Sequence, residues 1–190
     1  MSILTGPEIR RLAEGNFGVK GERIVIRPFD PAKCGPNSYD VHLGDTVAWY
    51  VNAGGTALGP SDIFDPLDPP RLESLKISPH GEVLRPGVLY LASTKEYTET
   101  HGLAPKLEGR SSLARGGLKV HLTAGFGDDG FCGHWTLELE VAHRYRIRAG
   151  MKIAQICYTT LLGDRQPYQG RYQGQTAAPT PSRFHLEAPR

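Results

Sequence analysis

The stretch Trp135-Thr136-Leu137-Glu138-Leu139-Glu140-Val141 alternates apolar and polar side chains without a break. Because successive side chains of a β-strand point to opposite faces, the pattern predicts a strand with Thr136, Glu138 and Glu140 on one face. Such acids commonly face water on a half-buried strand. A catalytic role would require one of them to lie in a pocket, where loss of solvent raises the pKa of a carboxyl and suits it to proton transfer.

Short runs of the same kind recur along most of the chain. Further strands are predicted at residues 24–26, 39–43, 46–51, 83–93, 120–123, 145–148 and 153–159, with a turn at Arg85-Pro86-Gly87. No strand–helix–strand alternation is present, which disfavours a parallel sheet. The pattern therefore predicts a mainly β fold, an antiparallel barrel or jelly roll.

The remaining segments are a short helix, a long loop and a tail. Residues 5–14 predict an N-terminal helix, with a capping box at Thr5-Gly6-Pro7-Glu8 and a stop at Gly15. Residues 52–80 are rich in Gly, Pro and Asp and predict a surface excursion with at most one short strand. Residues 1–165 are expected to form the β domain, and residues 166–190 a tail that is flexible or orders over a ligand.

Composition narrows the class of protein. The 190 residues suit one domain, and 23 Gly with 15 Pro suit many short strands joined by turns. The formal net charge is only +2, which disfavours binding to long nucleic acid but leaves room for a local anion site. Three cysteines without a CxxC motif, no signal-peptide pattern and no membrane-length apolar run lead us to expect a cytoplasmic protein with reduced thiols.

One heptapeptide concentrates groups that bind phosphate. Gly109-Arg110-Ser111-Ser112-Leu113-Ala114-Arg115 supplies two guanidinium groups, two hydroxyls and a glycine that lets the backbone approach a ligand. The alternative is a helix N-terminus capped by Ser111 or Ser112, with solvated arginines. Composition alone leaves these two interpretations about equally favoured.

A second candidate is Asp128-Asp129, which precedes Gly130. An Asp-Gly turn between two strands explains the pair on local grounds, although a carboxylate there could orient water or hold a sugar hydroxyl. Zinc deaminases carry H-x-E followed by P-C-x-x-C. Here His185-Leu186-Glu187 matches only the first half, and P-C-x-x-C is absent, which argues against a zinc mechanism and a zinc ligand set.

Taken together, these segments resemble the dCTP deaminase family. The resemblance rests on residues 106–115, on His121-Leu122-Thr123-Ala124-Gly125-Phe126, and on Leu137-Glu138-Leu139. It extends to residues 36–44, 150–155, 172–175 and 179–183, and so covers nearly the whole chain except the excursion.

The resemblance implies a dUTPase-like distorted jelly roll, a homotrimer with active sites at subunit interfaces, and hydrolytic deamination of dCTP. It implies Mg²⁺ bound through the nucleotide phosphates, with no metal held directly by the protein and no zinc. Feedback inhibition by dTTP is a further family expectation.

Residue by residue, the resemblance makes Glu138 the catalytic acid and base, with Ser111 and Arg115 positioning the water and stabilising the tetrahedral centre. Arg110, Ser112 and the neighbouring backbone would hold phosphates, and Asp128 would contact the deoxyribose. Thr136 and Leu137 would line the nucleotide site through main chain and side chain. The remaining expected nucleotide-binding residues are Leu113, Ala114, Gln155, Tyr168, Arg171 and Gln175.

The pair Gly125-Phe126 resembles the branch of the family that also cleaves the α–β phosphate bond and releases dUMP and pyrophosphate. Three functions stay open as alternatives: a deaminase that releases dUTP, a dUTP diphosphatase, and a non-catalytic nucleotide-binding regulatory trimer. Three departures from the family pattern stand out: Gly127, Asp129 and the segment 140–148, which is about two residues short; the last two are expected to alter a turn. Gly127 replaces an aliphatic residue and is expected to loosen the loop that carries Asp128, and Asp129 replaces a proline.

Overall fold

The alternating stretch is the end of strand β8 (Cys132–Val141), whose odd-numbered residues are buried while its even-numbered residues are half-buried. The computed structural model describes residues 2–186. The other strands are β1 (Arg23–Arg27), β2 (Tyr39–Tyr50), β3 (Leu72–Lys76), β4 (Glu82–Leu84), β5 (Tyr90–His101), β6 (Leu103–Gly109), β7 (Leu118–Val120), β9 (Tyr145–Ile147) and β10 (Lys152–Thr160). The helices are α1 (Gly6–Ala13) and α2 (Ser111–Arg115), with 3-10 turns at Pro31–Lys33 and Phe184–Leu186.

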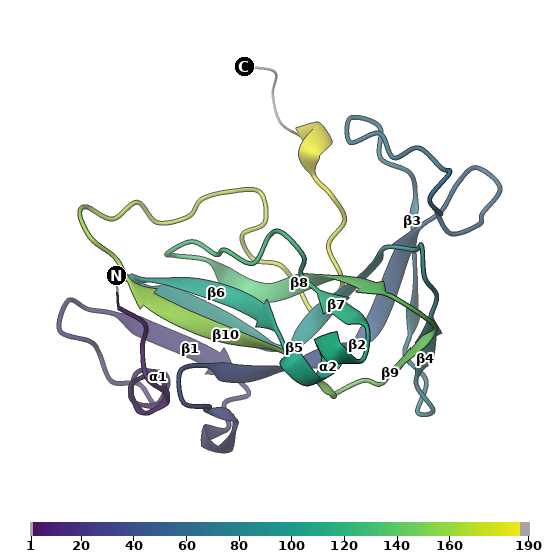
Figure 1. The fold of residues 1–190 in the computed structure, drawn as a ribbon. Coiled ribbons are helices and arrows are strands. Elements are labelled where there is room, and N and C mark those ends of the chain that lie inside the picture. Colours follow the sequence, from purple (N-terminus) through teal and green to yellow (C-terminus); the bar gives the residue numbers. More distant parts are fainter. Residues whose placement is uncertain (1, 187–190) are drawn as a thin grey trace.

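Eight strands form one antiparallel sheet. Its main path is β6-β10-β2-β5-β8-β7, while β1 pairs with β5 and β3 pairs with β2. Strands β4 and β9 form a separate two-stranded sheet. The curved main sheet and the few helices are visible in Figure 1, and the prediction of a mainly β fold with a short N-terminal helix is confirmed.

The sheet closes around one core. Tyr39, Leu43, Leu107, Leu137 and Tyr158 are completely or almost completely removed from solvent and come from four strands, β2, β6, β8 and β10. Burying a side chain of this size contributes about 1.5–3 kcal/mol. The buried half of β8 therefore fixes its other half in place, including Glu138.

Several predicted boundaries were wrong. Residues 39–43 and 46–51 are one strand, β2, whose pairing with β5 is irregular between Leu43 and Val47. The predicted capping box does not form, because Thr5 makes no side-chain cap and Glu8 instead binds Arg11. Strand β6 was missed because Leu103, Ala104 and Pro105 are all buried, so this segment lacks the period of two.

The excursion and the tail behave differently. Residues 52–71 contain no strand, β3 follows directly, and the segment projects from the far end of the sheet in Figure 1. The described tail instead lies along β8, where the His134 amide donates to the Gln175 carbonyl at 2.9 Å. Among residues 2–186, no helix is long and apolar enough to cross a membrane.

Candidate active site

The polar face of β8 forms one wall of a pocket of about 520 Å³. This volume is typical of small-ligand sites. The other walls come from the loop between β7 and β8, from the excursion and from the tail. The lining residues are Tyr50, Phe64, Leu89, Leu91, His121, Ala124, Phe126, Gly127, Asp128, Phe131, Trp135, Thr136, Glu138, Tyr168, Tyr172, Gln175, Thr180, Pro181 and Ser182.

The side chains of Glu138 and His121 lie next to each other in this pocket. Oε2 of Glu138 lies 2.6 Å from Nδ1 of His121, and the Glu138 side chain is 32% exposed while that of His121 is 6% exposed. The backbone holds them together too, since the His121 amide donates to the Glu138 carbonyl at 2.8 Å. The side-chain contact is close but not aligned as a hydrogen bond, since Nδ1 has no hydrogen-bond partner among the described residues. A carboxylate reached by solvent and braced by a buried imidazole can exchange a proton with a bound water.

His121 was not predicted from the sequence as the partner of Glu138. His121 adopts φ 55°, a left-handed conformation that is uncommon outside glycine. This backbone geometry turns the imidazole toward β8. No local pattern indicates it, since the contact depends on the pairing of β7 with β8.

The tail closes another side of the pocket through hydrogen bonds to β8 and β2. Thr136 Oγ1 lies 2.6 Å from Gln175 Oε1 and accepts from the Thr180 amide at 3.1 Å. The Ser182 amide donates to the Tyr50 hydroxyl at 2.7 Å. The tail is thus ordered over the pocket by contacts within one chain.

Asp129 anchors the base of this tail. Its carboxylate accepts from the Gly102 amide at 2.6 Å and from Arg165 at 2.7 and 3.0 Å, and its carbonyl accepts from the Tyr168 amide at 2.7 Å. Burial by itself would raise the pKa of Asp129, but the bonds from Arg165 and Gly102 outweigh it and hold that pKa below its usual value. The neighbouring Asp128 is exposed and lines the pocket.

The expectation that Gly127 loosens this loop was wrong. Gly127 is buried, its amide donates to the Pro105 carbonyl at 2.8 Å, and a Cβ at this position would collide with the Trp135 ring and lie 3.0 Å from Pro105 Cγ. Only glycine allows Trp135 to pack here, and that packing fixes the loop. Gly125 is equally constrained, since a Cβ would lie 2.5 Å from the Leu107 carbonyl oxygen.

A second group of predicted residues lies outside the pocket, around α2. Ser111, Ser112, Ala114 and Arg115 are exposed, and neither serine caps the helix, because Arg110 occupies the N-cap position without a side-chain cap. The alternative interpretation of capping serines was therefore wrong. Leu113, on the same short helix, is partly buried against the core.

Arg110 and Gln155 are fixed next to this helix. Arg110 forms an ion pair with Asp40. Gln155 donates to the Gly109 carbonyl at 3.3 Å and accepts from the Ser38 hydroxyl at 2.9 Å. None of these groups lines the pocket that holds Glu138.

Two further predicted residues are placed by their packing. The Leu137 side chain is completely buried on the core face of β8, so only its main chain is available to a ligand. Arg171 lies in the tail, where it donates to the Arg183 carbonyl at 3.0 Å. One chain therefore brings together Asp128, Thr136, Glu138, Tyr168 and Gln175, and places Arg110, Ser111, Ser112, Arg115 and Gln155 elsewhere.

Fold and site define a β-sheet protein with a small-ligand pocket and a separate exposed cluster of arginine and serine. Residues 3–161 match the family model "dCTP deaminase-like". The chain belongs to the dCTP deaminase-like family.

Similar proteins carry more specific names. The chain is 46% identical over 173 residues to "dCTP deaminase, dUMP-forming" of Leptospira biflexa, and 44% identical over 172 residues to a protein of the same name from Cytophaga hutchinsonii. Each alignment covers 90% of both chains. The fold is also similar to the crystal structure of 2'-deoxycytidine 5'-triphosphate deaminase from Agrobacterium tumefaciens, with a TM-score of 0.59, 20% identity, and coverage of 82% of this chain and 47% of that chain.

Proposed function

We propose that the protein deaminates dCTP hydrolytically and cleaves the α–β phosphate bond, forming dUMP, pyrophosphate and ammonia. The observation that carries the proposal is the Glu138 carboxylate in a ligand-sized pocket, 2.6 Å from the buried imidazole of His121. It agrees with the names of relatives that are 46% and 44% identical.

In the proposed deamination, Glu138 takes a proton from a water that attacks C4 of cytosine. Of the two protons that the water loses in all, one ends on ring N3 and one on the exocyclic amine. The C4–N bond breaks, ammonia leaves, and the C4 carbonyl of uracil forms. Ser111 and Arg115 would position the water and stabilise the tetrahedral centre, where charge-assisted donors are most effective. The main chain at Thr136 and Leu137 would hold the base.

Ser111 and Arg115 lie outside the pocket of their own chain, so the proposed site draws them from a second copy. This supports a homotrimer with interfacial active sites. Exposed Leu122 and Phe126, 47% and 68% accessible in the single chain, lie in the loop beside the pocket and suit coverage by a neighbour.

In the second step, a water attacks the α-phosphorus and pyrophosphate leaves. Asp128 would orient that water, and Arg110, Ser112 and the α2 backbone would hold the phosphates with Gln155, Tyr168, Arg171 and Gln175. Mg²⁺ bound to phosphate oxygens would neutralise charge there. The only carboxylates lining the described pocket are Glu138 and Asp128, which fits a metal held by the nucleotide rather than by a protein cage.

The direct test supplies dCTP, and separately dUTP, with Mg²⁺ and follows ammonia, pyrophosphate and nucleotide products. Ammonia, pyrophosphate and dUMP in equal amounts support the proposal. Ammonia with accumulating dUTP identifies a deaminase that stops after the first step. Pyrophosphate from dUTP with no ammonia from dCTP identifies a dUTP diphosphatase, and binding without turnover identifies a regulatory protein. Adding dTTP to the same assay tests feedback inhibition.

Metal removal provides a second test of the proposed chemistry. We expect full deaminase activity after exhaustive treatment with a zinc-selective chelator, and a loss in EDTA that Mg²⁺ reverses. Loss of activity that only Zn²⁺ restores would contradict a mechanism without catalytic zinc.

A further inference from the structure

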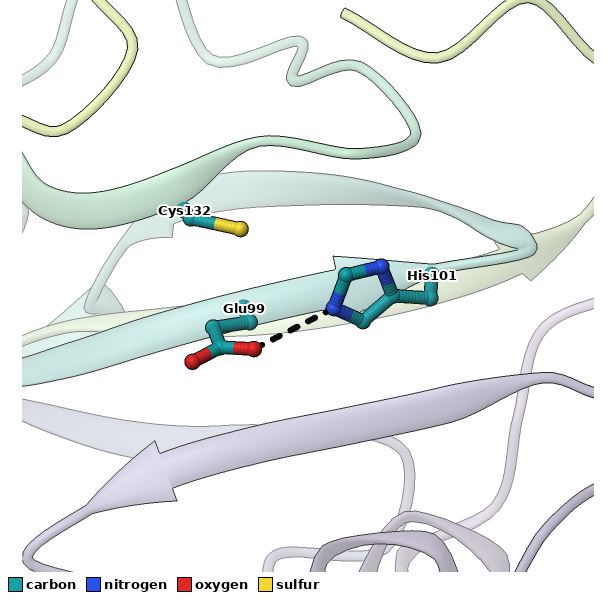
Figure 2. A group of neighbouring side chains, drawn as sticks. All are labelled: Glu99, His101 and Cys132. Carbon is teal, nitrogen blue, oxygen red and sulfur yellow. Dashed lines mark hydrogen bonds and ion pairs between the residues drawn. The ribbon is translucent and has the colours of Figure 1, made fainter.

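Three metal-ligand side chains meet on the half-buried face of the sheet, at the start of β8 and the end of β5. The register pairs Glu99 on β5 directly with Cys132 on β8, and His101 lies two residues beyond Glu99 on the same face. Figure 2 shows Glu99 and His101 on one strand and Cys132 on its neighbour, with the Cys132 sulfur extending toward the space between the strands.

The donor atoms are close enough to share one ion. A carboxylate oxygen of Glu99, a ring nitrogen of His101 and the sulfur of Cys132 all lie within 4.8 Å of one another, and Glu99 Oε2 is 3.2 Å from His101 Nε2. Ligands of a tetrahedral zinc ion, bonded at about 2.0–2.3 Å, are separated by roughly 3.3–3.8 Å. Small side-chain rotations would therefore complete the geometry.

The guanidinium group of Arg23 lies between Glu99 and His101 in the structure. Nη2 of Arg23 lies 3.0 Å from Glu99 Oε2 and 3.2 Å from His101 Nε2. The Arg23 side chain is 39% exposed and starts from the first residue of β1, so it can turn into solvent. A divalent ion and this guanidinium would compete for the same carboxylate.

We propose that Glu99, His101 and Cys132 form a site for a zinc-class divalent ion, Zn²⁺ or Co²⁺, that displaces Arg23. A thiolate with an imidazole favours these metals over Mg²⁺ and Ca²⁺, which prefer oxygen ligands alone. Three protein ligands leave the fourth position to water. Sequence motifs did not indicate the site, because its residues are joined only by strand pairing.

This site would be separate from the proposed catalysis. Cys132 and Glu138 lie six residues apart on β8, which at roughly 3.3 Å per residue places them ~20 Å apart. The Cys132 main chain also holds the tail, since its carbonyl accepts from the Gly174 amide at 2.8 Å and its amide donates to Gln173 Oε1 at 2.9 Å. The ion would thus fix the strand to which the tail is attached.

The test titrates Co²⁺ into chelator-treated full-length protein and records absorption, with Zn²⁺ competition to obtain its affinity. We expect visible cobalt bands and a thiolate-to-cobalt charge-transfer band. Cys132→Ser should remove the charge-transfer band, whereas the matched variants Cys34→Ser and Cys157→Ser should retain it. His101→Ala provides a second ligand variant that leaves the thiol in place, and it should weaken binding at least tenfold.

Arg23→Gln removes the competing guanidinium, so it should strengthen Zn²⁺ binding several-fold. Circular dichroism and basal ammonia release should be unchanged in every folded variant. Absence of the charge-transfer band in the wild type, its persistence in Cys132→Ser, or full affinity in His101→Ala would overturn the proposal. If Arg23→Gln weakened Zn²⁺ binding, Arg23 would not compete with the ion, and the proposed site at Glu99, His101 and Cys132 would be wrong.

Discussion

Glu138 lies in a pocket whose walls one chain builds by itself, whereas Ser111 and Arg115 lie on a five-residue helix exposed on the same chain. The pocket wall is fixed by the buried half of β8, by His121 and by the tail. Near α2, side-chain contacts include those of Arg110 with Asp40, of Gln155 with Ser38 and Gly109, and of Leu113 with the core. The proposed catalytic acid thus has a fixed position in one chain, while its proposed partners would come from another copy.

The largest effect is expected at the pocket wall. Glu138→Gln keeps the shape of the side chain but cannot accept a proton from water, so ammonia release should fall by about 10²–10⁴-fold. The matched control is Glu140→Gln, on the same face of the same strand, where Lys119 lies 3.4 Å away and the pocket does not reach. Activity of Glu138→Gln within tenfold of wild type would remove Glu138 from the mechanism.

A mixing experiment tests whether the two regions meet across subunits. Glu138→Gln and Arg115→Ala should each be inactive alone, yet co-expression should restore activity. Random assortment around a ring gives roughly a quarter of the sites an intact Glu138 and an intact Arg115. The control pairs Glu138→Gln with Arg144→Ala, an exposed arginine in the loop after β8, where every site that contains Glu138 remains active.

The outcome separates two architectures. No recovery in the first mixture would place the complete site within one chain, and a solution mass near that of one chain would remove the trimer with it. Recovery in a trimer would support the shared site.

The two regions also differ in how far the sequence could predict them. Alternation alone placed Thr136 and Glu138 on the open face of β8, because β periodicity is local. The role of Arg110–Arg115 was inferred only through the family resemblance, since its composition suits a surface helix equally well. The Glu138–His121 contact, the missed strand β6 and the Glu99–His101–Cys132 group depend on strand pairing, which the sequence pattern does not specify.

Asp129 illustrates the same limit. In the sequence it was a departure from a family proline, whereas in the structure its carboxylate joins the Gly102 amide to Arg165 at the base of the tail. Likewise, Gly127 suggested a loose loop until the Trp135 ring was found against it. The burial that decides both cases comes from residues distant in sequence.

A smaller effect is expected at Asp128, which lines the pocket and is proposed to act near the phosphates. Asp128→Asn retains the size of the side chain but removes the charge that would orient the second water, so the ratio of dUTP to dUMP should rise by roughly 10- to 100-fold. Single-turnover chromatography measures it. Asp164→Asn, an exposed carboxylate after β10, is the control. An unchanged dUMP yield in Asp128→Asn would keep the deaminase and remove this role for Asp128.

The smallest effect is expected at Asp129, whose ion pair with Arg165 fixes the base of the tail that forms one wall of the pocket. Because the pKa of Asp129 is lowered in the folded protein, its ion pair with Arg165 stabilises the fold fully above the unfolded value of about 3.8. That contribution is lost as the pH falls through the lower folded pKa.

Asp129→Asn should therefore reduce the free energy of unfolding by about 1–3 kcal/mol at pH 7, with the difference from wild type shrinking toward pH 3. Thermal unfolding across this range measures the difference, and Asp164→Asn should show no such dependence. A difference between Asp129→Asn and wild type that stayed constant from pH 7 to pH 3 would show that the Asp129 charge does not anchor the tail. The pocket wall would then depend on the other hydrogen bonds of the tail, among them those of Gly174, Gln175 and Ser182.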